Sequence, residues 1–241
     1  MKWTRDEQII SWLPRLQAHR GYWVGGLQQN SLESIAKAFE LGYEMAEFDV
    51  RTTSEGELIL FHDDFIEGVA ILKTRLAELK KLTPITTLEQ LFSWFRQTQG
   101  FKLNLEIKSK AIVNSAVEVK ICALIQKYGL AERILISSFN PLSLFRVKRI
   151  NAGIYRALLL TFKKEEGNNW IITSMIMNVF CKPHVLHLRF EDYSEIFRYL
   201  ALKVPIVLWT VNEAEVFEKY KSEIHGIISD KITPDFFKKL N

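Results

Sequence analysis

The chain lacks the usual marks of a disulfide-stabilised or membrane-spanning protein. It has 2 cysteines in 241 residues, too few for a small scaffold held together by several disulfides, and we expect Cys122 and Cys181 to be free thiols in a reducing compartment. No segment approaches the roughly 18 uninterrupted apolar residues of a transmembrane helix. Residues 1–14 carry charges and no apolar run of signal-peptide length, so we expect a cytoplasmic protein.

The chain also lacks a linker and a surface of one charge sign. No low-complexity or Pro/Gly/Ser-rich tract interrupts residues 1–241, so we expect a single domain with one core. The 32 Lys and Arg residues nearly balance 28 Asp and Glu residues, which gives a net charge of +4. Because the basic residues are scattered in mixed patches, the composition favours a solvated surface over a nucleic-acid interface. The oligomeric state stays open.

Short apolar strands alternate with amphipathic helices along the chain. The predicted strands are 16–19, 45–50, 58–61, 102–107, 134–138, 155–160, 185–189, 206–211 and 226–229. The predicted helices include 4–12, 112–128, 168–180, 193–202 and 214–220. With the return strand of one hairpin set aside, about eight βα units remain, the number that closes a TIM (β/α)8 barrel. The alternative, an open doubly wound sheet, needs a Gly-rich phosphate loop whose spacing the segment 21–26 does not have.

A β-hairpin is expected to extend the second strand. Segments 45–50 and 58–61 are too close in sequence for a crossover helix, so they must pair antiparallel. With a turn centred on Glu55-Gly56, Asp49 would face His62, and Glu47 would share that face. Because Glu-Gly is a weaker turn sequence than Asn-Gly, a longer loop that shifts this register stays an alternative.

Two capping boxes predict where helices begin. Asn30 with Glu33 is expected to cap the helix after the first strand, and Thr87 with Gln90 the helix that Gly100 ends. These boxes fix the ends of the loops that follow the first strand and the hairpin.

Polar residues gather where predicted strands end. In a βα barrel the working groups lie at the C-terminal ends of the strands. Glu47, Asp49 and Glu106 end neighbouring strands, and three carboxylates form a hard oxygen site suited to Mg²⁺ or Ca²⁺. His19 and His62 flank this site in the sequence pattern. The pattern predicts a metal centre with two imidazoles beside it.

This combination suits phosphodiester cleavage. One histidine can accept a proton from the attacking hydroxyl while the other donates a proton to the leaving alkoxide. Arg20 and Lys108 can bind phosphate, although both can instead form salt bridges with the acids. Trp209 is expected either to contact the substrate or to fill the top of the barrel.

Other candidate residues are assigned structural roles. Cys181, His184 and His187 have metal-like spacing, but no fourth ligand stands near them in the sequence, so an ordinary strand with polar residues is the better interpretation. His225 begins its strand and is therefore expected at the opposite end of the barrel.

A set of short motifs, weak singly but strong in order, runs over nearly the whole chain. The motifs are Ala18-His19-Arg20-Gly21, Gln29-Asn30-Ser31-Leu32, Glu47-Phe48-Asp49-Val50, Leu60-Phe61-His62-Asp63, Leu105-Glu106-Ile107-Lys108, Ser137-Ser138-Phe139, Trp209-Thr210-Val211-Asn212 and Gly226-Ile227-Ile228-Ser229-Asp230. In these motifs the sequence resembles the glycerophosphodiester phosphodiesterase family.

The resemblance implies a TIM barrel and metal-dependent hydrolysis of glycerophosphodiesters to sn-glycerol 3-phosphate and an alcohol. It implies that His19 and His62 are the acid/base pair, that the three carboxylates bind the metal, and that a cyclic phosphate forms on the way. A lysophospholipase D is the alternative enzyme, suggested by Tyr22, Trp23 and Phe65. A barrel that binds glycerophosphodiesters without turnover is the non-enzymatic alternative.

The chain departs from the family pattern at Gln29, where the family usually has Glu. Glutamine keeps the shape of the side chain but removes a charge, so a metal or substrate contact at this position is in question. The segment between Asp64 and Thr87 is also compact, which predicts a relatively open site.

Overall fold

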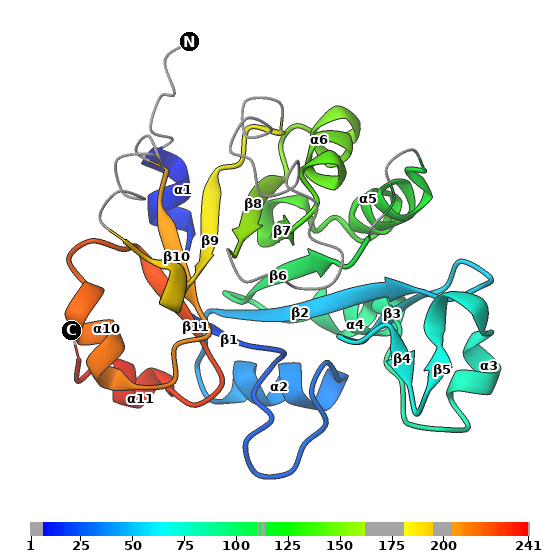
Figure 1. Ribbon diagram of the computed structural model, residues 1–241, viewed down its shortest axis with the longest axis horizontal. Helices are drawn as coiled ribbons and strands as arrows, with labels where there is room; N and C mark the ends of the chain where they lie inside the picture. Colours follow the sequence, from blue (N-terminus) through cyan, green and yellow to red (C-terminus); the bar gives the residue numbers. More distant parts are fainter. Residues whose placement is uncertain (1–6, 110, 112–113, 162–180, 195–203, 241) are drawn as a thin grey trace.

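The fold is a closed parallel barrel. The computed structural model describes residues 7–109, 111, 114–161, 181–194 and 204–240. Within these residues the barrel strands are β1 (Leu16–Ala18), β2 (Met45–Thr52), β6 (Lys102–Ile107), β7 (Ile134–Ser138), β8 (Tyr155–Leu160), β9 (Val185–Arg189), β10 (Ile206–Trp209) and β11 (Gly226–Ser229). They run in the order β1-β11-β10-β9-β8-β7-β6-β2, and β1 pairs with β2 to close the ring (Figure 1). The predicted TIM (β/α)8 barrel is confirmed.

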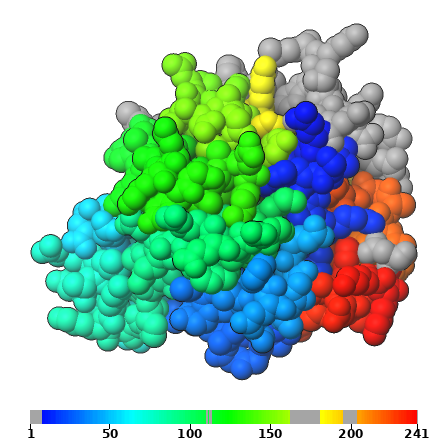
Figure 2. Space-filling view, turned by 180° about the vertical axis from the view of Figure 1, so that it is seen from behind, coloured from blue at the N-terminus to red at the C-terminus, as the bar shows by residue number. Residues whose placement is uncertain are grey.

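Helices surround the barrel and close one end of it. The described helices are α1 (Glu7–Trp12), α2 (Leu32–Glu40), α3 (Leu76–Leu79), α4 (Leu88–Phe95), α5 (Ala116–Tyr128), α6 (Pro141–Ile150), α10 (Ala214–Tyr220) and α11 (Pro234–Phe237), with short 3₁₀ turns η1 (Ile71–Lys73), η2 (Ala131–Arg133) and η4 (Phe190–Asp192). Seen from behind, side chains of the segments that contain α2, α4 and α5 cover the barrel (Figure 2). None of the described helices has the length and apolar character needed to cross a bilayer. The predicted helix 168–180 lies outside the described residues, and so does the predicted helix 193–202 except for residues 193 and 194, which are not helical.

Apolar side chains fill the N-terminal half of the barrel. Ile9 of α1 and the following Leu13 pack against Met45 and Leu135 inside the barrel. Above them, Asn104 Nδ2 donates a 2.9 Å hydrogen bond to Gln17 Oε1, and both side chains are fully buried. The charged side chains inside the barrel lie beyond this pair, toward the opposite, C-terminal end.

The hairpin forms in a register different from the predicted one. β3 (Leu58–Leu60) pairs antiparallel with β2, and Val50 lies opposite Leu60. Asp49 therefore faces Phe61, whose backbone N–H donates to the Asp49 carbonyl at 3.1 Å. The predicted pairing of Asp49 with His62 was wrong by one residue.

Turn geometry explains the shifted register. The Thr53 N–H donates to the Glu57 carbonyl at 2.9 Å, so the loop between them has three residues. Gly56 closes this loop at φ 81°, the left-handed conformation that three-residue hairpin loops require. The longer loop, which the sequence analysis gave as the alternative, is therefore the one that forms. After this hairpin, β4 (Phe65–Ile66) and β5 (Val69–Ala70) form a separate two-stranded sheet.

The two predicted capping boxes have different outcomes. Thr87 caps α4 with Gln90, as predicted. At α2 the cap is Ser31 with Ser34, so the predicted Asn30 box was wrong by one residue. Asn30 is instead bound to Asp49, because its Nδ2 donates to Asp49 Oδ2 at 2.9 Å. A side chain engaged in the site cannot also cap the helix.

Gly21 allows α2 to approach the end of β1 closely. Gly21 has φ 75°, and a Cβ built on it would lie 2.4 Å from Ser34 Oγ and 2.8 Å from the Ile35 nitrogen. We expect Gly21→Ala to lower the free energy of unfolding by about 3 kcal/mol, the sum of a steric and a conformational cost. Urea denaturation measures this loss.

Gly25→Ala is the matched control for this prediction. Gly25 also has a positive φ, 101°, but a Cβ there would meet nothing within 4 Å. We therefore expect a loss of about 1 kcal/mol or less. Equal losses in the two variants would contradict the close approach of α2 to Gly21.

Candidate active site

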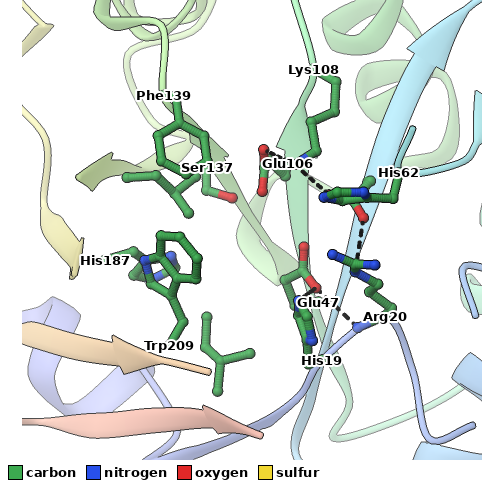
Figure 3. A pocket seen from close by; sticks show the side chains of 13 residues that line it. His19, Arg20, Glu47, His62, Glu106, Lys108, Ser137, Phe139, His187 and Trp209 are labelled. Atoms are coloured by element: carbon green, nitrogen blue, oxygen red, sulfur yellow. Dashed lines mark hydrogen bonds and ion pairs between the residues drawn. The ribbon is translucent and has the colours of Figure 1, made fainter. Parts of the chain in front are cut away.

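One pocket at the C-terminal rim of the barrel contains all the predicted site residues. Parallel strands point the same way, so the residues that end them share one rim. The pocket encloses about 540 Å³ of empty space, part of it open to solvent. The predicted residues that line it are His19, Arg20, Glu47, Asp49, His62, Glu106, Lys108 and Trp209 (Figure 3).

Three carboxylates lie together at the ends of β2 and β6. Asp49 is the register partner of Glu106, and Glu47 lies two residues earlier on the same face of β2. One ligand oxygen from each residue lies within 4.8 Å of the others, and all three residues are at most 5% exposed. These carboxylates can hold a metal ion.

Burial and mutual repulsion make this cluster unfavourable without a cation. Burial, and then the charges of Asp49 and Glu106, raise the pKa of Glu47 well above its ordinary value. Burial also raises the pKa of Glu106 to about 7. A divalent ion would favour the ionised forms of both groups, so the cluster fits a hard cation.

Lys108 and Arg20 provide the positive charge nearest to the carboxylates. Lys108 Nζ lies 2.6 Å from Glu106 Oε1 and 3.1 Å from Asp49 Oδ1, and Arg20 Nε lies 3.5 Å from Asp49 Oδ2. Burial acts to raise the pKa of Asp49, but the positive groups around it, Lys108 above all, lower that pKa to about 2. Both cations therefore form the salt bridges that the sequence left as an alternative, and phosphate binding by them stays a prediction.

Each of the two histidines is oriented by a carboxylate. His19 Nδ1 lies 2.7 Å from Asp230 Oδ1, and His62 Nδ1 lies 2.7 Å from Asp63 Oδ1. An Nδ1–H that donates to a carboxylate leaves Nε2 as the free nitrogen of a neutral ring. The His19 Nε2 lies 3.9 Å from Glu47 Oε2, on the side of the metal-ligand cluster. Both rings can therefore exchange a proton through Nε2.

Asp230 lies within hydrogen-bond distance of His19, a contact that the sequence did not reveal. It lies 211 positions from His19, and closure of the barrel brings the two together, because β1 pairs with β11. Asn212 Nδ2 donates to Asp230 Oδ2 at 2.9 Å and fixes that carboxylate. The partner of His62, Asp63, is by contrast the next residue in the sequence.

Gln29 contacts Arg20. Arg20 Nη1 donates to Gln29 Oε1 at 2.9 Å, and Arg20 in turn lies beside Asp49. The neutral amide therefore orients the guanidinium by a hydrogen bond, a contact that does not depend on the charge of the usual Glu.

The pocket also contains residues to which the sequence analysis assigned no role in the site. Ser137 and Phe139, from one of the family motifs, line the pocket with Trp209, and so do Leu159 and His187, which belong to no such motif. His187 was interpreted as an ordinary polar residue beside Cys181 and His184. Its place on β9, an inward position two residues after the interior Val185, was the only available signal.

Comparisons with known proteins agree with this fold. The sequence model of the glycerophosphoryl diester phosphodiesterase family matches residues 19–233. A glycerophosphodiester phosphodiesterase of Caldanaerobacter subterraneus subsp. tengcongensis is 29% identical over an alignment 242 residues long, gaps included. The alignment covers 88% of this chain and 92% of the relative.

Solved structures have the same fold. A glycerophosphodiester phosphodiesterase from Parabacteroides distasonis superposes with a TM-score of 0.80 at 24% identity, covering 94% of this chain and 96% of the other. An Oleispira antarctica phosphodiesterase in complex with the product sn-glycerol-3-phosphate has a TM-score of 0.80 at 23% identity, covering 95% and 97%.

Protonation of the carboxylates predicts how stability responds to pH and metal. With a chelator present, Glu106 stays protonated in the folded chain between pH 4.5 and about 7, where the unfolded chain ionises it. Because Glu106 then binds more protons in the folded state, its contribution to stability falls as pH rises through this window. Below pH 6.5 the histidines with lowered pKa values, His187 above all, act in the opposite direction, so we expect the net fall above pH 6.5. Between pH 6.5 and 8 we expect the Tm to fall by on the order of 3 °C and Mg²⁺ or Ca²⁺ to raise it more at pH 8 than at pH 6.5. Calorimetry at several pH values measures both effects.

Glu106→Gln tests the source of this pH dependence. An amide does not titrate, so the variant should lose part of the pH dependence and part of the metal effect. Asp49 does not obscure the result, because its lowered pKa confines its contribution to pH values below its ordinary value of 3.8. A chelated wild-type protein whose Tm stays constant or rises between pH 6.5 and 8 would contradict the prediction. Glu55 does not line the pocket, and its lowered pKa confines its contribution to pH values below 4.5, so Glu55→Gln is the surface control.

Proposed function

The chain belongs to the glycerophosphoryl diester phosphodiesterase family, and from this premise we propose that it hydrolyses glycerophosphodiesters to sn-glycerol 3-phosphate and an alcohol in a metal-dependent reaction. One observation carries the proposal. Two histidines, each oriented by its own carboxylate, flank three buried carboxylates in a single pocket. This arrangement supplies both a cation site and two proton-transfer groups where a phosphodiester can bind.

The charged groups would bind and polarise the phosphate. Glu47, Asp49 and Glu106 would hold Mg²⁺ or Ca²⁺, and the ion, when bound, would offset negative charge on the phosphoryl oxygens. Lys108 and Arg20 lie beside these acids and would contact the remaining phosphate oxygens. A bound metal ion would weaken the salt bridges that Lys108 and Arg20 form with the acids, because the charge of the ion would compensate the carboxylates.

The histidines would transfer protons in two steps. In the first, one imidazole takes the proton of the glycerol 2-hydroxyl while its oxygen attacks phosphorus, and the other imidazole protonates the leaving alkoxide. The product of this step is a cyclic phosphate and the free alcohol. Water then opens the ring with the proton transfers reversed. Burial, and then Lys108, lower the pKa of His62, which favours its neutral, proton-accepting form near pH 7.

The lysophospholipase D alternative has limited support. Among the three predicted rim residues, Phe65 is 56% exposed, whereas Tyr22 packs on the core and Trp23 Nε1 is buried. One exposed aromatic side chain offers little surface for an acyl chain. Family membership argues against a barrel without turnover.

We expect the purified protein to release glycerol 3-phosphate from glycerophosphocholine with Mg²⁺ or Ca²⁺, and EDTA to abolish the release. His19→Ala and His62→Ala should each lower kcat by about 10²–10⁴-fold, because each removes one proton-transfer group. An enzyme-coupled assay for glycerol 3-phosphate measures the rates, and lysophosphatidylcholine assayed in parallel tests the alternative substrate.

His225→Gln is the control for these variants. His225 bonds the Leu13 carbonyl at the far end of the barrel, so its replacement should leave kcat at the wild-type value. Unchanged kcat in either of the two alanine variants would exclude the role assigned to that histidine. Faster turnover of lysophosphatidylcholine than of glycerophosphocholine would favour lysophospholipase D.

A further inference from the structure

The wall of the pocket opposite the carboxylates is neutral. Around the closed ring β9 lies four strands from β2 in either direction, so residues at the end of β9 face those at the end of β2. His187 comes from β9 and Trp209 from β10, and Ser137 of β7, the register partner of Glu106, forms the edge of this wall beside the carboxylates (Figure 3). The charged side chains of the pocket come from β2 and β6 and from the residues that directly follow β1 and β6.

The polar atoms of this wall have no partner in the described part of the chain. His187 is fully buried, and neither Nδ1 nor Nε2 has a hydrogen-bond partner there. The Ser137 hydroxyl, in a residue that is 1% exposed, and Trp209 Nε1 are also unpartnered. Buried polar groups without partners cost free energy and are rare in native proteins. Three of them on one wall of a pocket indicate a ligand.

The chemistry of these groups selects the kind of ligand. Burial lowers the pKa of His187 to about 3, so its ring is neutral at physiological pH and has one N–H donor and one nitrogen acceptor. The Ser137 hydroxyl likewise donates and accepts. A group that both donates and accepts matches a hydroxyl, whereas an ammonium only donates and a phosphate dianion only accepts. The other lining residues on this wall, Phe139 and Leu159, add no charge.

We propose that His187 and Ser137 form a hydroxyl-binding subsite that holds the free primary hydroxyl of the substrate's glycerol while the phosphate binds at the carboxylates opposite. This inference rests on the proposed function and adds a specificity determinant to it. A hydroxyl on the leaving alcohol has the same chemistry, so the experiment must separate these two sources. His187 in this role positions the substrate and does not exchange a proton with the reacting atoms.

The test compares glycerophosphocholine with its analogue that lacks the free primary hydroxyl, propane-1,2-diol phosphocholine, which retains the attacking secondary hydroxyl. We expect the wild-type enzyme to prefer glycerophosphocholine by about 10- to 100-fold in kcat/KM, because the analogue leaves buried polar groups unpaired. His187→Phe should reduce this preference to within about threefold, chiefly through KM. His187→Gln, which keeps a donor and an acceptor, should retain part of it.

Two further variants keep the test decisive. Ser137→Ala should also reduce the preference, and it serves if the His187 variants do not fold. Leu159→Val changes the same wall without removing a hydrogen-bonding group, so its preference should equal that of the wild-type enzyme. A preference in His187→Phe and Ser137→Ala equal to the wild-type value would overturn the subsite, even if the rates on both substrates fall together.

Glycerophosphoglycerol separates the two sources of hydroxyl. His187→Phe could lose a preference for glycerophosphoglycerol over glycerophosphocholine but keep the preference for glycerophosphocholine over the deoxy analogue. In that case the subsite binds a hydroxyl of the leaving alcohol, which overturns its assignment to the substrate's glycerol. A wild-type protein that hydrolyses none of these diesters overturns the proposed function itself. An active wild-type enzyme that does not discriminate between the substrates overturns only the subsite.

Discussion

The site depends on one electrostatic constraint, the burial of three carboxylates at the ends of two adjacent strands. Hydrogen bonding between β2 and β6 holds Asp49 beside Glu106, so the acids cannot separate to reduce their repulsion. Lys108 and Arg20 offset part of the negative charge. Burial first, and then the neighbouring acids, keep the pKa values of Glu47 and Glu106 raised in spite of these two cations, and a divalent ion would favour the ionised forms.

The loop between β1 and α2 contacts this carboxylate cluster directly. Asn30 bonds both the carboxylate and the backbone N–H of Asp49, so the cap of α2 is the next residue, Ser31. Gly21 lets α2 approach the end of β1, and the preceding Arg20 N–H donates to Glu47 at 3.0 Å. The carboxylates thus determine the local conformation of the loop that contains two of the family motifs.

The pocket is divided into a charged half and a neutral half. Charges gather on β1, β2 and β6, whereas the wall from β7 to β10 offers uncharged polar groups such as His187 and Ser137. A glycerophosphodiester has the same division, because its anionic phosphate lies beside an uncharged polyol. The two walls match the two chemical parts of one substrate.

The sequence by itself determined the barrel and identified the three carboxylates and two histidines that meet in one pocket, because strand periodicity and strand-end motifs are local patterns. Its errors were one-residue shifts, at the hairpin of β2 and β3 and at the cap of α2. Both arose where a turn conformation or a distant side chain outweighed a local preference. Only the tertiary structure paired His19 with Asp230 and brought His187 opposite Glu47, because ring closure joins strands that are far apart in the chain.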